Sequence, residues 1–508
     1  MRKIPAKLPR VRTSVGSVLA ASLRTSMRTS LCIVSGAVII PVLVSACSTV
    51  PEYDVPGIAV PAHFGGVNGW TGWTSADPAD TIARGAWWEA FGDSELDRLE
   101  AKLRVSNQSI QKALADLDQA RAAVTYQKAG FYPTVSASVT YDPSRTSASL
   151  EGKSLAGYTV PDHSLGLTAS WEPDVFGRIR ASVAVAQADQ QASQSDLAAV
   201  KLAMHTQLAL DYFQLRSLEQ QGVIVNRALK AYTDAYKAQK SALEQGAIDA
   251  SVVAQAQAQM DATRTQAIDL QNQRAIMLHA IATLVGQPAS GFSIPEQVPD
   301  TPDAMTATTP TATHLPVIPP SLPSQLLQRR PDIAAAERRV NAANAQIGVA
   351  RTAYFPSVEL AATAGLQSTF LSPWLTAPSL FWSLGPQLIG TLFDGGKRAA
   401  LMTTAHAQYA SAVADYRQTV LQAFQSVEDS LSSGQSLQEE KRSQDSATAA
   451  SQVALRLMTN RYNAGAVSFL DLITTRTIAL SNEQLDAQIA GRQLAASVML
   501  IESVGGTW

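Results

Sequence analysis

Two segments of this chain are compatible with little besides very long helices. Residues 178–244 and 397–463 each span 67 positions without a proline and with a single glycine. Both are rich in alanine, glutamine and leucine, which are strong helix formers. At about 1.5 Å of rise per residue, each segment predicts a helix roughly 100 Å long. Because this is far longer than helices in ordinary globular domains, the sequence predicts extended and closely packed helical arms.

Each long segment is followed by a tight turn and a second helical segment. The turns are expected at Gly246 and Gly465, and residues 251–285 and 468–504 are long enough to return antiparallel along the distal half. In the second arm, apolar side chains recur four and three positions apart, as in a coiled coil: Tyr409, Val413, Tyr416, Val420, Ala423 and Val427. One such arm could equally be a dimeric coiled-coil spacer. Two duplicated arms argue against that alternative.

The chain also repeats itself at long range. Residues 129–133 (Ala-Gly-Phe-Tyr-Pro) recur as residues 352–356 (Thr-Ala-Tyr-Phe-Pro), and the Gly-Ala pair at 246–247 recurs at 465–466. Landmarks in one order at nearly constant spacing indicate an internal tandem duplication of a unit of about 220 residues. We therefore expect two helix-hairpin-helix repeats, residues 94–286 and 324–508, with a first helix over residues 94–128. A Pro/Thr-rich connection, residues 287–323, joins them.

Four stretches alternate apolar side chains with small or hydroxylic ones, which is the period-two pattern of strands. The apolar positions are Val135, Ala137, Val139 and Tyr141; Leu165, Leu167, Ala169 and Trp171; Val358, Leu360, Ala362, Ala364 and Leu366; and Trp382, Leu384 and Leu388. One apolar face and one polar face are typical of outer-membrane barrel strands around a polar lumen. The alternative is a small antiparallel sheet in a soluble domain. Four strands cannot close a barrel, which needs about eight, so several chains would have to share one.

Aromatic side chains cluster at the ends of these strands, where a membrane barrel carries an aromatic girdle. They are Phe131, Tyr132, Tyr354, Phe355, Trp374, Phe381 and Trp382. The girdle strengthens the prediction of strands that face lipid.

The first 46 residues predict a secretory signal, because they carry seven basic side chains, no acidic one and an apolar stretch. The run that ends at Cys47, Leu-Val-Ser-Ala-Cys, resembles a bacterial lipoprotein box. This resemblance implies a lipid on the Cys47 thiol and cleavage before it, and Ser48 resembles the residue of lipoproteins sent to the outer membrane. The alternative is an ordinary signal with an incidental cysteine. Met27 would begin a complete signal by itself, so we expect translation to start there. Residues 47–93 would form a lipid-anchored tether.

Charge and residue patterns exclude several classes of function. Residues 47–508 contain 33 basic and 42 acidic side chains, a formal charge of −9. This negative charge argues against binding to nucleic acid. Lipidation would use Cys47, and the other cysteine, Cys32, lies in the signal, so no disulfide is expected. No later stretch approaches the roughly 20 apolar residues of a spanning helix. Histidines without metal-ligand spacing and the lack of a nucleophile motif predict no catalytic site, no metal and no cofactor apart from the covalent lipid.

Several motifs together resemble the outer-membrane factor lipoprotein family, the outer-membrane channels of tripartite resistance-nodulation-division efflux pumps. They are Trp87-Trp88 with Phe91, Asp93 and Leu96; residues 326–333 (Leu-Leu-Gln-Arg-Arg-Pro-Asp-Ile) with Glu337; residues 354–356 (Tyr-Phe-Pro); residues 393–396 (Phe-Asp-Gly-Gly); Arg461-Tyr462 with Gly465, Leu470 and Asp471; and residues 505–508 (Gly-Gly-Thr-Trp). The resemblance implies an α+β membrane protein that forms a homotrimer. Three chains would share a 12-stranded transmembrane β-barrel, continued by a long periplasmic α-helical barrel of coiled-coil arms.

The resemblance also implies a function and its partners. The chain would be a passive exit duct for small molecules, driven by an inner-membrane efflux transporter through a periplasmic membrane-fusion adaptor that grips the helical tips. Within the same architecture, the alternative is a type I secretion channel for polypeptides. The lipoprotein box and the double arginine at 329–330 favour efflux. A lipid-anchored periplasmic coiled-coil scaffold without a pore is the alternative from another class.

A gate near the helical tips is implied by the family, whose members close the lumen there through side-chain links and acidic rings. Tyr462 and Asp471 match those motif positions, and Ser251 supplies a hydroxyl but no acid opposite the tyrosine. Thr474 stands where some members carry a second acid, which puts ionic links in doubt. The structural alternative for Asp471 is a cap near the N-terminus of the returning helix.

Overall fold

The computed structural model describes residues 50–58, 64, 85–149, 157–297 and 330–506, all within one compact unit of the chain. The predicted signal, Cys47 and most of the predicted 287–323 connection lie outside the described residues. The α-helices are α2 (Ser94–Ser106), α3 (Gln108–Ala129), α4 (Arg178–Glu244), α5 (Ala250–Leu284), α7 (Pro331–Thr352), α8 (Lys397–Asn463) and α9 (Phe469–Ser503). The described residues also form three short 3-10 helices, η1 (Trp87–Phe91), η2 (Ala289–Gly291) and η3 (Ala377–Ser379).

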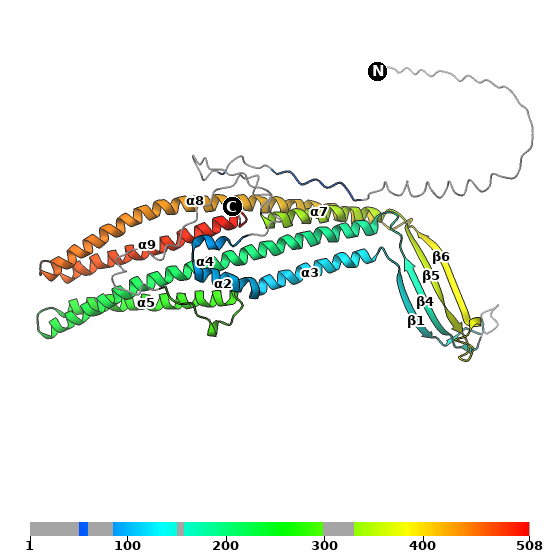
Figure 1. The fold of residues 1–508 in the computed structure, drawn as a ribbon, viewed down its shortest axis with the longest axis horizontal. Helices are drawn as coiled ribbons and strands as arrows, with labels where there is room; N and C mark the ends of the chain where they lie inside the picture. Colours follow the sequence, from blue (N-terminus) through cyan, green and yellow to red (C-terminus); the bar gives the residue numbers. More distant parts are fainter. Residues whose placement is uncertain (1–49, 59–63, 65–84, 150–156, 298–329, 507–508) are drawn as a thin grey trace, which may run out of the picture. The chain divides into compact units, whose positions relative to one another are not determined.

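The long helices form two antiparallel pairs. Helix α4 packs along α5 and α8 packs along α9 (Figure 1). Both α4 and α8 have 67 residues, and both α5 and α9 have 35. The predicted bounds of the two long helices are confirmed, because nothing within either segment interrupts a helix before the glycine turn. The remaining helices form a layer in which α3 contacts α4, α4 contacts α7, and α7 contacts α8.

The predicted first helix over residues 94–128 is wrong in one respect, because it is interrupted at Asn107. There the chain leaves the helical conformation, and the Asn107 side chain accepts a hydrogen bond from the Ile110 amide at 3.0 Å, capping α3. The Asn107 Nδ2 also donates to the Leu284 carbonyl oxygen at 2.8 Å. The break therefore ties the first helix of the repeat to its last.

The strands form one antiparallel sheet in the order β1-β4-β5-β6. Their bounds are β1 (Thr134–Tyr141), β4 (His163–Trp171), β5 (Ser357–Ser368) and β6 (Leu380–Ile389). Both strand pairs predicted from the alternation are confirmed, one from each repeat. A further two-stranded sheet of β2 (Ser144–Arg145) and β3 (Thr159–Val160) extends the first hairpin and was not predicted.

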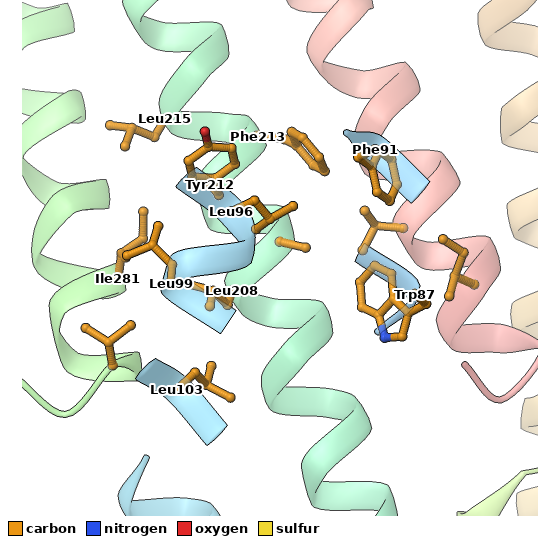
Figure 2. Close-up of a cluster of buried hydrophobic side chains, with 14 of the residues drawn as sticks. Trp87, Phe91, Leu96, Leu99, Leu103, Leu208, Tyr212, Phe213, Leu215 and Ile281 are labelled. Atoms are coloured by element: carbon orange, nitrogen blue, oxygen red, sulfur yellow. The ribbon is translucent and has the colours of Figure 1, made fainter. Parts of the chain in front are cut away.

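The core of the helical part lies around α4. Figure 2 shows buried side chains from η1, α2, α4 and α5 converging, among them Phe91, Leu99, Tyr212 and Ile281. A second cluster between α7 and α8 buries the predicted heptad side chains: Tyr416, Val420, Ala423 and Val427, with Tyr409 and Val413 packed against them. The predicted heptad face is thus buried, but its main partner is α7 and not the length of the returning helix α9.

Each repeat turns from strand to helix through an aspartate and a glycine. Asp394 accepts hydrogen bonds from the amides of Gly396 and Arg398, and Asp174 accepts them from the amides that open α4. The glycines before α4 and α8, Gly177 and Gly396, have φ of 77° and 93°, a left-handed region that favours glycine. The motif at residues 393–396 therefore forms a glycine-dependent turn, and residues 174–177 form its counterpart in the first repeat.

The Arg-Pro-Asp segment at residues 330–332 stabilises the start of α7. Pro331 occupies the first turn of the helix, where proline is favoured. The Arg330 guanidinium pairs with the Asp332 carboxylate at 2.7 Å and donates to the Ser503 carbonyl oxygen at 3.0 Å. This arginine joins α7 to the end of α9.

One pair of titratable groups is buried between α2 and α4. The Glu100 Oε2 lies 2.5 Å from the His205 Nδ1, and the Glu100 side chain is fully buried. Burial, with a smaller contribution from the charge of Asp97, raises the pKa of Glu100 to about 9. Burial, with contributions from Arg104 and Lys201, lowers the pKa of His205 to about 4. At neutral pH the contact is therefore an uncharged carboxyl that donates to a neutral imidazole.

We expect this carboxyl to make the protein less stable as pH rises. The unfolded Glu100 ionises near pH 4.5, whereas the folded group stays protonated up to about 9. Above pH 6.5, where the opposite contribution of His205 is complete, the free energy of unfolding should fall by about 1.4 kcal/mol per pH unit. Thermal denaturation at pH 7.0 and 8.5 should show a smaller loss for Glu100→Gln than for the wild type. Equal losses would contradict a protonated Glu100; the exposed Asp116→Asn serves as the control.

Among the helices that the structure describes, none is both long and apolar enough to cross a membrane.

Candidate channel face and helical tips

The four-stranded sheet has one apolar and one hydroxyl face, and the register places like residues opposite one another across all four strands. One row runs Ala137, Leu167, Ala364, Trp382. The next row runs Ser136, Thr168, Thr363, Ser383. Because side chains alternate between faces, each row faces the side opposite to its neighbour. The alternation predicted in single strands thus holds across the whole sheet.

The apolar face of the sheet is left uncovered by the other residues that the structure describes. Leu167 is 55 % exposed and Trp382 is 74 % exposed, and several apolar neighbours share this exposure: Val135, Val139, Leu384 and Leu388. A contiguous exposed apolar surface of this kind marks a contact with lipid or with another protein. Strands β1 and β6 are the edges of the sheet, each hydrogen-bonded on one side only.

Aromatic side chains lie at both ends of the sheet. Phe131 and Phe355 are at the junction with the helices, where the Trp171 Nε1 donates to the Phe131 carbonyl oxygen at 3.0 Å and Phe355 stacks on Phe176. At the opposite end, the Trp374 Nε1 donates to the Leu366 carbonyl oxygen at 3.3 Å. The structure therefore places Phe131, Phe355 and Trp374 at the ends of the strands. The girdle prediction is wrong for Phe381 and Trp382, which share rows with Gly166 and Leu167 in the middle of β4.

The two helical arms end in glycine turns. Gly246 and Gly465 have φ of 74° and 72° and lie directly after α4 and α8. The amide of Gly465 donates to the Tyr462 carbonyl oxygen at 2.9 Å, and the amide of Ala466 donates to the Arg461 carbonyl oxygen at 2.9 Å. These bonds satisfy carbonyls at the helix end, as a left-handed C-terminal glycine allows.

Tyr462 joins the two arms near their tips. Its hydroxyl accepts a hydrogen bond at 2.7 Å from the Nε2 of Gln239, a buried residue of α4. Its ring lies 6.1 Å from the ring of Phe469 on α9. Ser251 does not take part in this contact; its amide donates instead to the Asp249 carboxylate at 2.7 Å, which caps α5. Within the described chain, the partner of Tyr462 is therefore Gln239, a residue that the sequence did not single out.

Asp471 is held in a capping box at the start of α9. The Ser468 Oγ accepts from the Asp471 amide, and the Asp471 carboxylate accepts from the Ser468 amide at 3.1 Å. Hydrogen bonds from the Ser468 side chain and backbone, with a smaller contribution from Arg461, lower the pKa of Asp471 below its usual value. The carboxylate is thus ionised and exposed at the tip. The roles of Asp471, Tyr462 and Ser251 in a gate remain predictions.

We expect the Gln239–Tyr462 contact to hold the arms together. Removal of one uncharged hydrogen bond costs about 0.5–1.5 kcal/mol, so Gln239→Leu and Tyr462→Phe should each raise resting conductance about two- to tenfold in planar bilayers. Because both variants remove the same bond, the double variant should add little. The exposed Gln257→Leu on α5 is the control. Fully additive effects, or unchanged conductance, would show that this bond does not restrain the tips.

The described residues contain no group of three or more His, Cys, Asp or Glu side chains that could hold a metal ion. The sheet has an apolar face and a hydroxyl face, and it is joined to two pairs of long antiparallel helices. This is the architecture of a protomer of an outer-membrane channel.

The sequence pattern of the family described as "Outer membrane efflux protein" matches residues 100–287 and 322–506. The chain belongs to this family, and each of the two matched segments covers one of the helix-strand-helix halves.

Similar proteins include the "Probable efflux pump outer membrane protein TtgC" of Pseudomonas putida, 29% identical, with 92% of this chain and 94% of the relative covered. The "Cation efflux system protein CusC" of Escherichia coli is 27% identical, with 91% and 96% covered. Among solved structures, the outer-membrane channel OprN superimposes with a TM-score of 0.78 at 28% identity, over 91% of this chain and 100% of that one. The expected outer-membrane efflux function is confirmed.

Proposed function

We propose that three copies of this chain share one 12-stranded β-barrel, with the apolar rows toward lipid and the hydroxyl rows toward a water-filled lumen. The observation that carries this proposal is the open four-stranded sheet with two edge strands and opposite faces of opposite character. Joining β1 of one protomer to β6 of the next satisfies both edges, and three copies supply enough strands for closure. The helical arms would then surround the same axis as an α-helical barrel.

In this assembly the protein acts as a passive exit duct for small molecules. A lumen lined by serine and threonine hydroxyls offers water-like contacts and little basis for selecting a substrate, so selection falls to an inner-membrane transporter. A periplasmic adaptor would connect the two at the helical tips around Gly246 and Gly465. Support comes from TtgC and CusC, whose names place them in an efflux pump and a cation efflux system.

A covalent lipid on Cys47 would hold the amino terminus of the mature chain at the membrane. The support is the leader and the Leu-Val-Ser-Ala-Cys run. Tyr53 then donates to the Glu337 carbonyl oxygen at 3.3 Å, which fastens the tether to α7.

Disulfide trapping tests the shared barrel. Within one protomer β1 and β6 are separated by two strands, a gap of about 14 Å, which is beyond the reach of a disulfide. Cysteine pairs that combine Val135, Ala137 or Val139 of β1 with Leu384 of β6 should therefore form only intermolecular bonds. We expect oxidation to give covalent dimers and trimers on denaturing gels, but nothing larger.

The matched control pairs Ala137 with Ala364 on β5, since these positions share a row but are separated by β4 in any copy. It should stay monomeric. The shared barrel would be ruled out if the control gave as much covalent dimer and trimer as the β1–β6 pairs, or if every pair stayed monomeric.

A further inference from the structure

A cavity of about 920 Å³ lies on the side of the helix layer that carries η1 and the amino-terminal segment. Its walls come from η1, the end of α2, the middle of α4, and α7. Pockets for small organic ligands typically measure about 300–1,000 Å³. Its lining residues come from the helices and from the segments around Tyr53 and Gly85, and none comes from the strands.

Two cations at this cavity are uncompensated. Arg104 and Lys201 both line it, both are exposed, and within the described part of the chain neither has a carboxylate within 4.0 Å or a hydrogen-bond partner. The third lining cation, Arg338, is paired with Glu337 at 3.0 Å. Both free cations lie close enough to His205 to disfavour its protonation. The cavity therefore presents net positive charge to a ligand.

An aromatic wall stands beside these cations. The half-buried Trp88 stacks on His205 with ring centroids 4.6 Å apart and planes 16° from parallel. The hydrogen bond between the His205 Nδ1 and the buried Glu100 carboxyl holds the imidazole ring in place. Trp87 meets Trp88 edge-on at 5.7 Å and completes a rigid surface with Ile110 and Leu202. Flat aromatic groups pack well against such a wall.

We propose that this cavity binds a small aromatic anion, with its carboxylate or sulfonate between Arg104 and Lys201 and its ring against Trp88. The pair of unpartnered cations accounts for the anionic group, and the stacked tryptophan accounts for the ring. The carboxylate of Glu337 in the lining opposes ligands with many negative charges, so a mono- or dianion fits better than a polyphosphate. The site would give the helical part of the protein a ligand-binding position away from the strands.

Fluorine NMR on the full-length protein in a non-ionic detergent tests this proposal. The probe is 4-(trifluoromethyl)benzoate, and the matched neutral probe is 4-(trifluoromethyl)benzamide, which has the same ring without the charge. We expect saturable binding of the benzoate, at least tenfold weaker binding of the benzamide, and no displacement of the benzoate by acetate. Empty micelles measure partition into detergent.

Variants locate the binding. Arg104→Gln and Lys201→Gln alter exposed side chains, and each should weaken benzoate binding at least fivefold; Trp88→Leu should weaken both aromatic probes. Lys102→Gln on α2 and Lys230→Gln on α4, which remove cations outside the cavity, should bind as the wild type does. Equal affinity for the two probes, or wild-type affinity in the Arg104→Gln, Lys201→Gln double variant, would overturn the proposal.

Discussion

Replacing Leu167 with arginine should prevent the trimer from accumulating in the outer membrane. Leu167 is 55 % exposed and lies between Ala137 and Ala364 on the apolar face. An arginine on the lipid side of a barrel costs about 2–4 kcal/mol near the bilayer midplane, and a trimer would carry three copies. Because native proteins are stable by only about 5–15 kcal/mol, the combined cost is comparable with the whole stability.

The neighbouring residue provides the control. Thr168 lies in the hydroxyl row between Ser136 and Thr363, so Thr168→Arg should place its charge in water and be tolerated. Leu360→Arg and Thr363→Arg form a second matched pair on β5. Gels of unheated outer membranes would show the trimer band for the hydroxyl-face variants and its loss for the apolar-face variants. Similar yields from both faces would argue against a sheet that divides lipid from water.

Replacing Cys47 with serine should abolish lipid attachment completely. The thiol is the group that receives the lipid in a lipoprotein box, and a serine hydroxyl does not replace it in that transfer. Radioactive palmitate should no longer label the protein, and the uncleaved precursor should accumulate. Cys32→Ser, which removes the other cysteine of the chain, should leave labelling unchanged. Label that persists in Cys47→Ser would disprove the assignment.

The long helices and the strands could be predicted because their signals are local. Residues 178–244 and 397–463 became α4 and α8 with the expected bounds, since a missing proline and rare glycine leave a helix uninterrupted. The alternating segment from Thr134 to Tyr141 became β1 for a similar reason, because the polarity of each side chain indicates which face of the strand it occupies. In these elements, local preference and the final packing agree.

The features that were missed depend on residues far apart in the sequence. Asn107 interrupts the first helix because its side chain donates a hydrogen bond to Leu284, 177 positions away. The residues next to Asn107 in the sequence do not predict that bond. Gln239 lies among several glutamines, and only its contact with Tyr462, 223 positions away, distinguishes it. The Gln239–Tyr462 contact also joins one duplicated arm to the other, so it exists only after both repeats have folded together.

The bond between Gln239 and Tyr462 joins two uncharged side chains, and this has a consequence for how the tips respond to the periplasm. Salt screens contacts between exposed ions but has little effect on a partly buried neutral hydrogen bond. The restraint should therefore persist when the osmolarity and salinity of the surroundings change, as they do for a cell that moves between fresh water and brine. In the proposed complex with an adaptor, we expect mechanical force from that partner, rather than a change in dissolved ions, to separate the two arms.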